Sequence, residues 1–343
     1  MRPFLSSLTR ICELQGDVPT APIARENWAH ADLVMVEMVS ESNALSKLEL
    51  ATGRMIDLVR GDRLVGALGR RQATLECVGS FEDVKDDLVL DLMTPGGLLG
   101  KITSQSSFLG PLPKLRYCGH LVVQGEKANL KNYVGLLPIH PLHLPVILII
   151  GTSMSAGKTA SAKSMIRLLK EAGMGVLAAK LTGAARYRDV LSMQDAGADR
   201  VYDFVDVGLP STVCPEDEFE PALRQLLSRL ALHEAEVVVV EAGASPLEPY
   251  NGACAIRHLL PQVVFSVLAA SDPYAVAGVM QAFEFRADLV TGVATNTSAA
   301  LTLVEKLTGV AALNLLDESS REPLRQMLLS ALDGRPQAGA PRS

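Results

Sequence analysis

Features that would place a chain in a special class are scarce in this sequence. Cysteine occurs five times in 343 residues, in no C-x-x-C pair and at no metal-binding spacing, which favours reduced thiols in the cytoplasm. No apolar run reaches the roughly 18 residues needed to cross a bilayer, and polar residues at 12–17 interrupt any signal-peptide core. We therefore expect a cytoplasmic protein with no membrane partner. The cysteines are Cys12, Cys77, Cys118, Cys214 and Cys254.

Basic residues are not in excess either. The 32 Lys and Arg residues stand against 38 Asp and Glu residues, which gives a formal net charge of −6 and argues against a nucleic-acid partner. Apolar side chains, in contrast, are plentiful. With 48% hydrophobic and 20% charged residues, the chain can bury a sizeable core and is not of the disordered class. Its length allows two domains.

The segment that organises the rest is residues 145–159, PVILIIGTSMSAGKT. Its apolar, β-branched run 146–150 predicts a buried strand, and a helix is expected from Lys158 to about residue 172. Backbone N–H groups of a glycine-containing loop and of the helix that follows it favour a bound anion. We therefore predict a phosphate-binding loop formed by Gly151, Thr152, Ser153, Met154, Ser155, Ala156 and Gly157.

The two residues after this loop have side chains suited to a nucleotide. Lys158 can reach the β- and γ-phosphates, and the Thr159 hydroxyl can bind Mg²⁺. The spacing departs from G-x-x-x-x-G-K-[ST], because Thr152 stands at the position of the first glycine and Gly151 precedes it. The alternative is an ordinary strand–turn–helix in which a lysine follows a helix-starting glycine. The strand before the loop and the helix after it favour the phosphate loop.

The first 143 residues consist of short β-like runs, several of them separated by turn signals such as Gly61-Asp62. This spacing predicts a small antiparallel sheet or barrel. We expect this smaller β-rich domain, 1–143, to bind substrate or to mediate oligomerisation. The β-like runs are 33–39, 63–68, 73–78, 88–92, 98–103 and 119–123.

Two further features of this region bear on how a ligand could enter. Three prolines within residues 137–145 indicate an interdomain linker. A local basic cluster is either a solvated face or a contact for an acidic substrate that enters between the domains. The cluster consists of Arg54, Arg60, Arg63, Arg70 and Arg71.

From residue 144 to 333, strands alternate with helices. This alternation predicts an α/β P-loop domain with a doubly wound parallel sheet, followed by a tail at 334–343 that we expect to be disordered. Ligands of such sheets bind at the carboxyl ends of the strands. Besides the loop, this rule selects Lys180, Glu241 and Asn296, which end or follow predicted strands.

These residues are open to more than one interpretation. Glu241 either holds Mg²⁺ opposite Thr159 or is a strand-end acid that faces solvent. Lys180 can stabilise charge on a transferring phosphate or hold an anionic substrate. Asn296 either reads the edge of a purine through paired hydrogen bonds or belongs to a helix N-cap region. Among the acids of the second crossover, Asp195 is our candidate for a second metal carboxylate.

Four motifs resemble those of a known family. Residues 151–159 resemble the G-T-x-x-x-x-G-K-T loop of dethiobiotin synthetase and its relatives, which belong to the P-loop class. Lys180 falls where the family has a lysine at the end of its second strand. Residues 240–244 are similar to its V-E-G-A-G segment, and residues 292–296 to its G-x-x-x-N segment. The resemblance covers the C-terminal part of the chain. It implies a P-loop NTPase that binds ATP, with Mg²⁺ on Glu241 and adenine on Asn296.

The resemblance does not extend to the substrate positions. Leu181 and Ala184 stand where dethiobiotin synthetase has proline and serine, and Ser153 and Ser155 stand where its loop is acidic. The loop is also similar to that of P-loop proteins with a divergent N-terminal domain. Some of that group are linked to N-acetylation of D-amino acids with acetyl-CoA.

We therefore expect an ATP- and Mg²⁺-dependent enzyme, a dethiobiotin synthetase-like ligase or kinase. It would activate a small carboxylate or carbamate by phosphoryl transfer and couple it to an acceptor. Lys158 and Lys180 would be its catalytic residues, acting by positioning and electrostatics. Two alternatives stay open: a CoA-dependent N-acyltransferase on the same fold, and a nucleotide-switched NTPase that binds a partner. A homodimer is the expected assembly.

Overall fold

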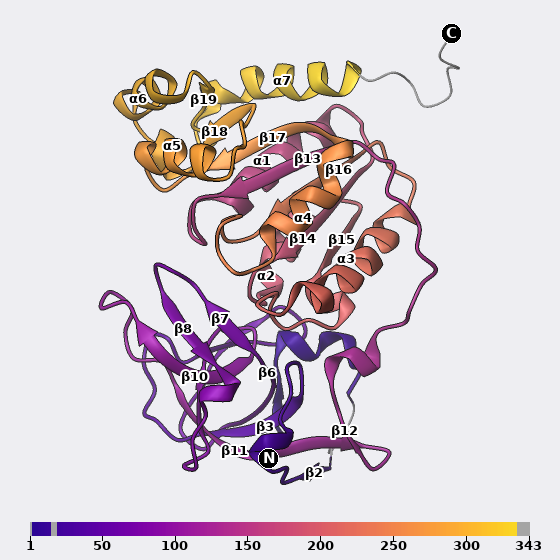
Figure 1. Cartoon of the computed structure of the whole chain (residues 1–343), viewed down its shortest axis with the longest axis vertical. Coiled ribbons are helices and arrows are strands. Elements are labelled where there is room, and N and C mark those ends of the chain that lie inside the picture. Colours follow the sequence, from indigo (N-terminus) through magenta and orange to yellow (C-terminus); the bar gives the residue numbers. More distant parts are fainter. Residues whose placement is uncertain (1, 15–18, 335–343) are drawn as a thin grey trace.

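The structure is a computed structural model that describes residues 2–14 and 19–334. A β-rich N-terminal part and an α/β C-terminal part are stacked one on the other (Figure 1). The segment between them, 134–145, contains no helix or strand. Within the described residues, no helix combines the length and the apolar character needed to cross a bilayer. Of the tail predicted to be disordered, 335–343 lies outside the described residues.

The N-terminal part is a β-barrel with extra strands at its edges, together with a separate two-stranded sheet of β4 and β5. Five strands pair in the order β6-β3-β11-β9-β10, and the parallel pairing of β6 with β10 closes the ring. The other pairings in the ring are antiparallel. The strands are β1 (Phe4–Leu5), β2 (Thr20–Ala21), β3 (Leu33–Met38), β4 (Lys47–Glu49), β5 (Met55–Asp57), β6 (Arg63–Leu68), β7 (Arg70–Gln72), β8 (Cys77–Ser80), β9 (Val89–Leu92), β10 (Leu98–Gln105), β11 (Lys114–Val123) and β12 (Glu126–Lys127).

Alternating side chains give the barrel strands two apolar faces. In β3, Val34 and Val36 are fully buried and share one cluster with Leu64 of β6. Their neighbours Leu33 in β3 and Val65 in β6 are also fully buried, but they belong to a second cluster that continues into the C-terminal part. Since successive strand residues point to opposite sides, the outer face of these strands is covered by the C-terminal part.

The C-terminal part is a parallel sheet of seven strands in the order β15-β14-β16-β13-β17-β18-β19. All its pairings are parallel, which confirms the predicted α/β class. The strands are β13 (Val146–Gly151), β14 (Val176–Thr182), β15 (Arg200–Asp203), β16 (Val237–Ala242), β17 (Val263–Ala269), β18 (Leu289–Thr291) and β19 (Ala311–Ala312). The helices are α1 (Lys158–Glu171), α2 (Tyr187–Asp195), α3 (Glu216–Ala231), α4 (Gly252–Leu259), α5 (Pro273–Ala282), α6 (Ser298–Thr308) and α7 (Arg321–Asp333).

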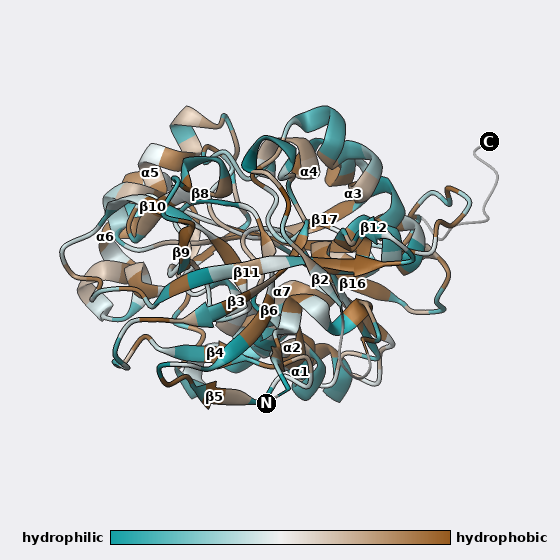
Figure 2. Ribbon diagram, turned by 90° about the horizontal axis from the view of Figure 1, so that it is seen from below, coloured by the Kyte–Doolittle hydropathy of each residue, from teal (hydrophilic) through white to brown (hydrophobic). Residues whose placement is uncertain are grey.

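Alternate residues of the central strand β13 pack against helices on opposite faces of the sheet. Ile147 and Ile149 share a cluster with residues of α1 and α7. Val146, Leu148 and Ile150 share another with residues of α3 and α4. A strand covered on both faces is apolar throughout, and β16 beside it is coloured hydrophobic in Figure 2 for the same reason. The sheet is therefore doubly wound.

The elements differ in several places from the sequence prediction, as in strand β11, which begins at Lys114 rather than at residue 119. Strand β8 begins at Cys77 rather than at residue 73, because residues 73–76 form the turn after β7, with hydrogen bonds from Glu76 N to Ala73 O and from Ala73 N to Cys77 O. The sequence pattern also does not predict α4. This helix starts after Asn251, which has a positive φ of 61°.

Buried polar contacts join the two parts. Arg10 donates to Asp203 at 2.6 Å and to Asp206 at 2.9 Å, and the side chains of Arg10 and Asp203 are buried. The Tyr250 hydroxyl accepts a hydrogen bond from the backbone N of Gln72 at 2.9 Å. Breaking a buried ion pair leaves an uncompensated charge. These contacts therefore hold the barrel against the sheet in one arrangement.

Helix α2 takes its N-terminal cap from the other part of the chain. Glu49 of β4 is fully buried and accepts from the backbone N of Tyr187 at 2.7 Å and of Arg188 at 2.8 Å. The Ser7 hydroxyl donates to the same carboxylate at 2.6 Å. The first N–H groups of a helix have no partner within the helix and favour a negative charge. Glu49 therefore fixes the first turn of α2, which carries Asp189.

The substitution Glu49→Ala should lower the free energy of unfolding by about 2–4 kcal/mol, because it leaves the first N–H groups of α2 and the buried Ser7 hydroxyl without their charged acceptor. Denaturant unfolding measures this change. The matched control is Glu41→Ala, which removes the exposed partner of Arg60 and should cost less than about 0.5 kcal/mol. Equal losses in the two variants would contradict the importance of the cap.

Candidate functional site

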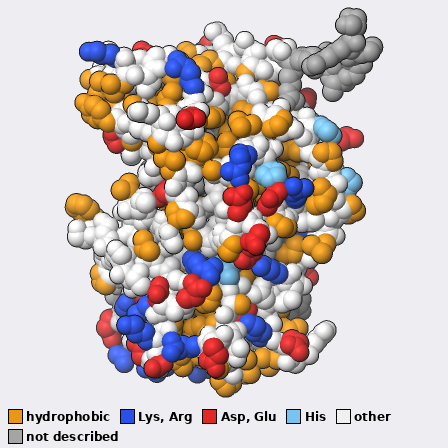
Figure 3. Space-filling view, in the orientation of Figure 1, with side chains coloured by type: hydrophobic (Ala, Val, Ile, Leu, Met, Phe, Trp, Pro, Cys, Tyr) orange, Lys and Arg blue, Asp and Glu red, His pale blue; other side chains and the backbone are white. Residues whose placement is uncertain are grey.

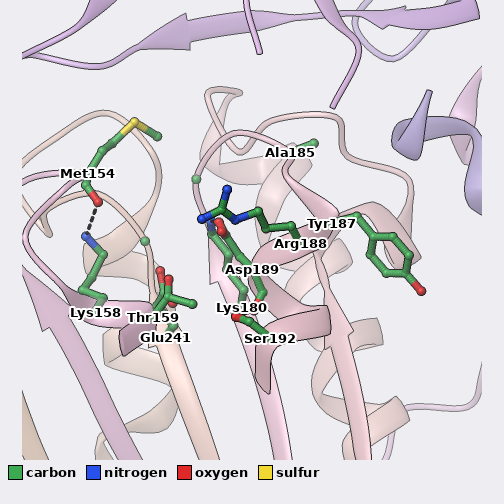
Figure 4. A network of polar contacts seen from close by, with 12 residues as sticks. Met154, Lys158, Thr159, Lys180, Ala185, Tyr187, Arg188, Asp189, Ser192 and Glu241 are labelled. Atoms are coloured by element: carbon green, nitrogen blue, oxygen red, sulfur yellow. Dashed lines mark hydrogen bonds and ion pairs between the residues drawn. The ribbon is translucent and has the colours of Figure 1, made fainter. Parts of the chain in front are cut away.

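The order of the strands brings three predicted residues together at the carboxyl edge of the sheet. Strand β16 lies between β13 and β14, and its Glu241 is in register with Lys180 of β14. The Thr159 hydroxyl, at the start of α1, donates to Glu241 Oε2 at 2.9 Å. Figure 4 shows Glu241 beside Thr159, with Lys180 on the neighbouring strand. Both Lys180 and Glu241 are buried.

A cavity of about 150 Å³ opens at this edge, between the sheet and the barrel. Strands of the N-terminal part pass above the site residues in Figure 4. The cavity therefore has a floor from one part of the chain and a cover from the other. Its charged and polar lining residues are Arg71, Glu76, Thr94, Ser155, Lys158, Thr159, Lys180, Arg186, Asp189 and Glu241.

The unusual glycine spacing of the loop has a steric cause. A Cβ added at Gly151 would lie 2.8 Å from both Cδ and Nζ of Lys158, because the lysine side chain passes over this residue. Position 152, in contrast, has a side chain that takes part in a hydrogen bond. The Thr152 hydroxyl accepts from Ser271 N at 3.0 Å, which ties the loop to the residues after β17. Gly157 has a φ of 104°, a value that glycine adopts without strain.

Lys158 is folded back onto its own loop. Its ammonium donates to the carbonyl oxygens of Ser153 at 2.5 Å and of Met154 at 3.5 Å, the second contact being the dashed line in Figure 4. Burial lowers the pKa of Lys158 to about 8, although the nearby Glu241 favours its charged form. The loop thus holds a buried cation whose partners are neutral carbonyl groups.

Lys180 has a charged partner that we did not predict. Its ammonium forms an ion pair with Asp189 in the first turn of α2. Burial alone would lower the pKa of Lys180, but Asp189 and Glu241 hold it above its usual range. Burial would likewise raise the pKa of Asp189, but Lys180 holds it below its usual range. Both groups are therefore charged at neutral pH.

The predicted metal ligand Asp195 does not line the cavity. It is exposed at the last residue of α2, whereas the first turn of this helix faces the cavity. The other acids of the crossover are also engaged elsewhere, Asp199 with Lys170 and Asp203 with Arg10. The start of a crossover helix lies at the carboxyl edge of a parallel sheet, and this rule could have selected Asp189.

The Thr159 and Glu241 oxygens fit a hard divalent cation. Mg²⁺ usually takes one or two protein oxygens and completes its shell with water and phosphate oxygens. The hydrogen bond of 2.9 Å between them shows that both side chains point to one spot. Across residues 2–14 and 19–334, no group of three or more His, Cys, Asp or Glu side chains is arranged to hold a metal. The donors therefore suit Mg²⁺ bound together with a phosphate.

Asn296 lines a separate, smaller pocket of about 90 Å³. Gly157, Gly292 and Asn314 also border this pocket, whereas Lys158 borders the larger cavity. The start of α1 thus separates the two spaces. Asn296 follows the short turn of residues 293–295, and the N-cap of α6 is Thr297. Its amide is therefore not used as that cap.

Only one arginine of the predicted basic cluster reaches the cavity. Arg60, Arg63 and Arg70 pair with Glu41, Glu37 and Glu82 on the outside of the barrel, and Arg54 is exposed. Figure 3 shows basic and acidic side chains intermixed over the N-terminal part. Arg71 is the exception, since it is buried and lines the cavity. The cluster as a whole is a solvated face.

The strand, glycine-containing loop and helix on a doubly wound parallel sheet define the C-terminal part as a P-loop fold. No protein-family model and no curated protein matches the sequence. Among solved structures, the chain is similar to hydrogenase maturation factor HypB from Archaeoglobus fulgidus, with 13% identity over 55% of this chain and 91% of that chain, and a TM-score of 0.38.

Two other solved structures are similar over comparable lengths. A ParA family ATPase from Chlorobium tepidum has 13% identity over 57% of this chain and 94% of that chain, with a TM-score of 0.32. A DUF1611 family protein from Anabaena variabilis has 14% identity over 59% of this chain and 62% of that chain, with a TM-score of 0.38. The similarity in each case is limited to a little over half of this chain.

The Lys180–Asp189 pair can be tested by a double-mutant cycle. Asp189→Ala should cost about 3 kcal/mol of unfolding free energy, because it leaves the buried Lys180 ammonium without its ion-pair partner. Adding Lys180→Met should recover at least about 1 kcal/mol of that loss. Chemical denaturation of the four proteins measures the coupling. Additive losses would contradict the ion pair.

Proposed function

We propose that this protein is an Mg²⁺-dependent P-loop enzyme. It binds ATP through residues 151–159 and transfers the terminal phosphate group to a small carboxylate or carbamate in the cavity. The activated acid is then coupled to an amine or similar acceptor. The observation that supports this proposal most is that the phosphate loop, the Thr159–Glu241 oxygen pair and Lys180 all border one cavity beneath the barrel.

The buried lysines supply the charge that phosphoryl transfer requires. Lys158 is held within the loop by carbonyl oxygens, and a bound polyphosphate would offer its ammonium much stronger acceptors. Lys180 is anchored by Asp189, so its ammonium is already in place beside Glu241. A positioned cation stabilises negative charge as it develops on the transferred group, without reorganisation at the moment of reaction.

Thr159 and Glu241 are the residues that would hold Mg²⁺. When bound, the ion would neutralise charge on the phosphate oxygens. The proposed phosphoryl transfer begins with attack of a substrate carboxylate oxygen on the γ-phosphorus. The bond from the γ-phosphorus to the bridging oxygen then breaks, and ADP leaves. In the second half the acceptor amine attacks the carbonyl carbon, phosphate leaves with its bonding electron pair, and the amine nitrogen gives up a proton, which the leaving phosphate can accept.

The N-terminal part covers the cavity, and this cover supports the proposal of a reaction from which water must be excluded. An acyl phosphate formed in the open would be lost to hydrolysis, and closed sites prevent that loss. The barrel lies over the sheet edge through buried contacts such as Arg10–Asp203 and Tyr250–Gln72. The Asn296 pocket on the other side of α1 is the proposed place for the adenine, as the resemblance to dethiobiotin synthetase implies.

ATP with Mg²⁺ should raise the melting temperature by several degrees, because a ligand at about a hundredfold excess over its Kd stabilises the native state by about 2.7 kcal/mol. The shift should vanish in Lys158→Ala and persist in Lys163→Ala, the matched control on the same helix. GTP with Mg²⁺ and acetyl-CoA are measured in parallel. A shift with acetyl-CoA alone would contradict the proposal and favour an N-acyltransferase, whereas a shift with GTP alone would contradict the choice of ATP.

Nucleotide affinity should fall as the pH rises above about 8. Burial lowers the pKa of free Lys158 to about 8, and phosphate binding requires its charged form. Above that pH, binding must take up a proton, so Kd should rise by up to tenfold per pH unit. Calorimetry between pH 7 and 9.5, in two buffers of different ionisation enthalpy, measures both Kd and proton uptake. A constant Kd without proton uptake would contradict this role for Lys158.

A further inference from the structure

Arg71 differs from every other arginine of its cluster. It lies in β7, where it is 9% exposed, and it borders the cavity that also contains Lys158 and Lys180. Its neighbour Arg70 pairs instead with Glu82 on the outside of the barrel. Because successive strand residues face opposite sides, position 71 is the one in this cluster that directs its guanidinium towards the cavity.

The guanidinium of Arg71 is incompletely satisfied where it lies. It donates to the backbone oxygen of Met93 and to the carboxylate of Glu76. Its buried Nε–H has no hydrogen-bond partner among the described residues. An arginine presents five N–H donors in a fixed planar fork, and a buried donor left unpaired is unfavourable. The site thus has unused capacity for an anion.

The partner of Arg71 is also in contact with the phosphate loop. Glu76 accepts from Arg71 through Oε2, and from the Ser155 hydroxyl through Oε1 at 3.3 Å. A single carboxylate therefore separates the Arg71 guanidinium from the loop. Glu76 is the more accessible partner, with 32% of its side chain exposed against 10% for Arg71. It lies in the turn between β7 and β8, so it can move more readily than the buried arginine.

We propose that Arg71 binds the terminal phosphate of the nucleotide and that Glu76 occupies its place when no nucleotide is bound. This inference rests on the proposed function, since it requires a nucleoside triphosphate at the loop. On binding, the γ-phosphate oxygens replace the Glu76 carboxylate on the planar fork of Arg71, an arrangement to which guanidinium is well suited. The barrel then adds a contact to the third phosphate, which Lys158 of the loop also reaches.

The other cations of the cavity are less available for this task. Lys180 already has an ion-pair partner in Asp189, an anchored residue of α2, and Lys158 belongs to the loop itself. Arg186 also borders the cavity, but it precedes α2 and is partly exposed. Arg71 is the one among them that combines burial, an unpaired donor and a displaceable partner.

The test compares the affinities of a non-hydrolysable ATP analogue and of ADP, both with Mg²⁺, by calorimetry. Arg71→Ala should weaken binding of the analogue by about tenfold or more, the loss expected for one charge-assisted contact, and leave ADP affinity unchanged. Arg63→Ala, which removes an exposed arginine of the same cluster, should change neither affinity. Glu76→Gln should strengthen binding of the analogue severalfold, because the competing carboxylate is gone.

The outcomes distinguish failure of the proposed function from failure of the role proposed for Arg71. If the wild-type protein binds neither nucleotide, the proposed function fails and this inference fails with it. If the wild type binds both, but Arg71→Ala weakens both equally or neither, only the role of Arg71 is overturned. Weaker binding of the analogue to Glu76→Gln would overturn the competition between Glu76 and the phosphate. Glutamine has nearly the same size and shape as glutamate, so the result for Glu76→Gln can be interpreted even if Arg71→Ala is unstable.

Discussion

The cost of burying charge at one edge of a parallel sheet is the constraint on which the rest of this structure depends. Lys158, at the start of the helix that follows β13, and Lys180, near the end of β14, are both withdrawn from water at the carboxyl edge of the sheet. Each ammonium would be strongly disfavoured there without compensation. Lys180 is compensated by Asp189 and lies beside Glu241, whereas Lys158 has only carbonyl oxygens as direct partners. This difference explains why burial depresses the pKa of one lysine, while the pKa of the other is raised.

The N-terminal part contributes to this arrangement through contacts that the C-terminal part could not make alone. Glu49 caps the helix whose first turn carries Asp189, and so holds the partner of Lys180 in place. The apolar cluster of the sheet continues into Leu33 and Val65 of the barrel. The two parts therefore share one core as well as one cavity, and the N-terminal part is a structural component of the site.

Local patterns explain what the sequence predicted well. The β-branched run of β13, the glycines at 151 and 157 and the residues that end β14 and β16 each carry their signal within a few positions. The sheet class and the meeting of Thr159, Lys180 and Glu241 followed from these signals. Local patterns gave less information about the closure of the barrel, since the parallel pairing of β6 with β10 joins segments that are separate in the chain.

Contacts between distant segments account for what was missed. Glu49 lies 138 residues from Tyr187, and Glu76 lies 79 residues from Ser155, so no local pattern could connect them. The prediction of Asp195 among several acids of one crossover did not use the rule that a crossover helix begins at the carboxyl edge of the sheet. The position of α2 makes Asp189 the residue that faces the cavity and places Asp195 at the far end.

The most direct test of the central claim is a crystal structure with a non-hydrolysable ATP analogue and Mg²⁺. We expect the triphosphate on residues 151–159, the ion on Thr159 and Glu241, and the Lys158 ammonium moved from the Ser153 carbonyl to the phosphates. Electron density for the triphosphate away from residues 151–159, or at the loop with Lys158 still bound to Ser153, would contradict the assignment of this site to the nucleotide phosphates.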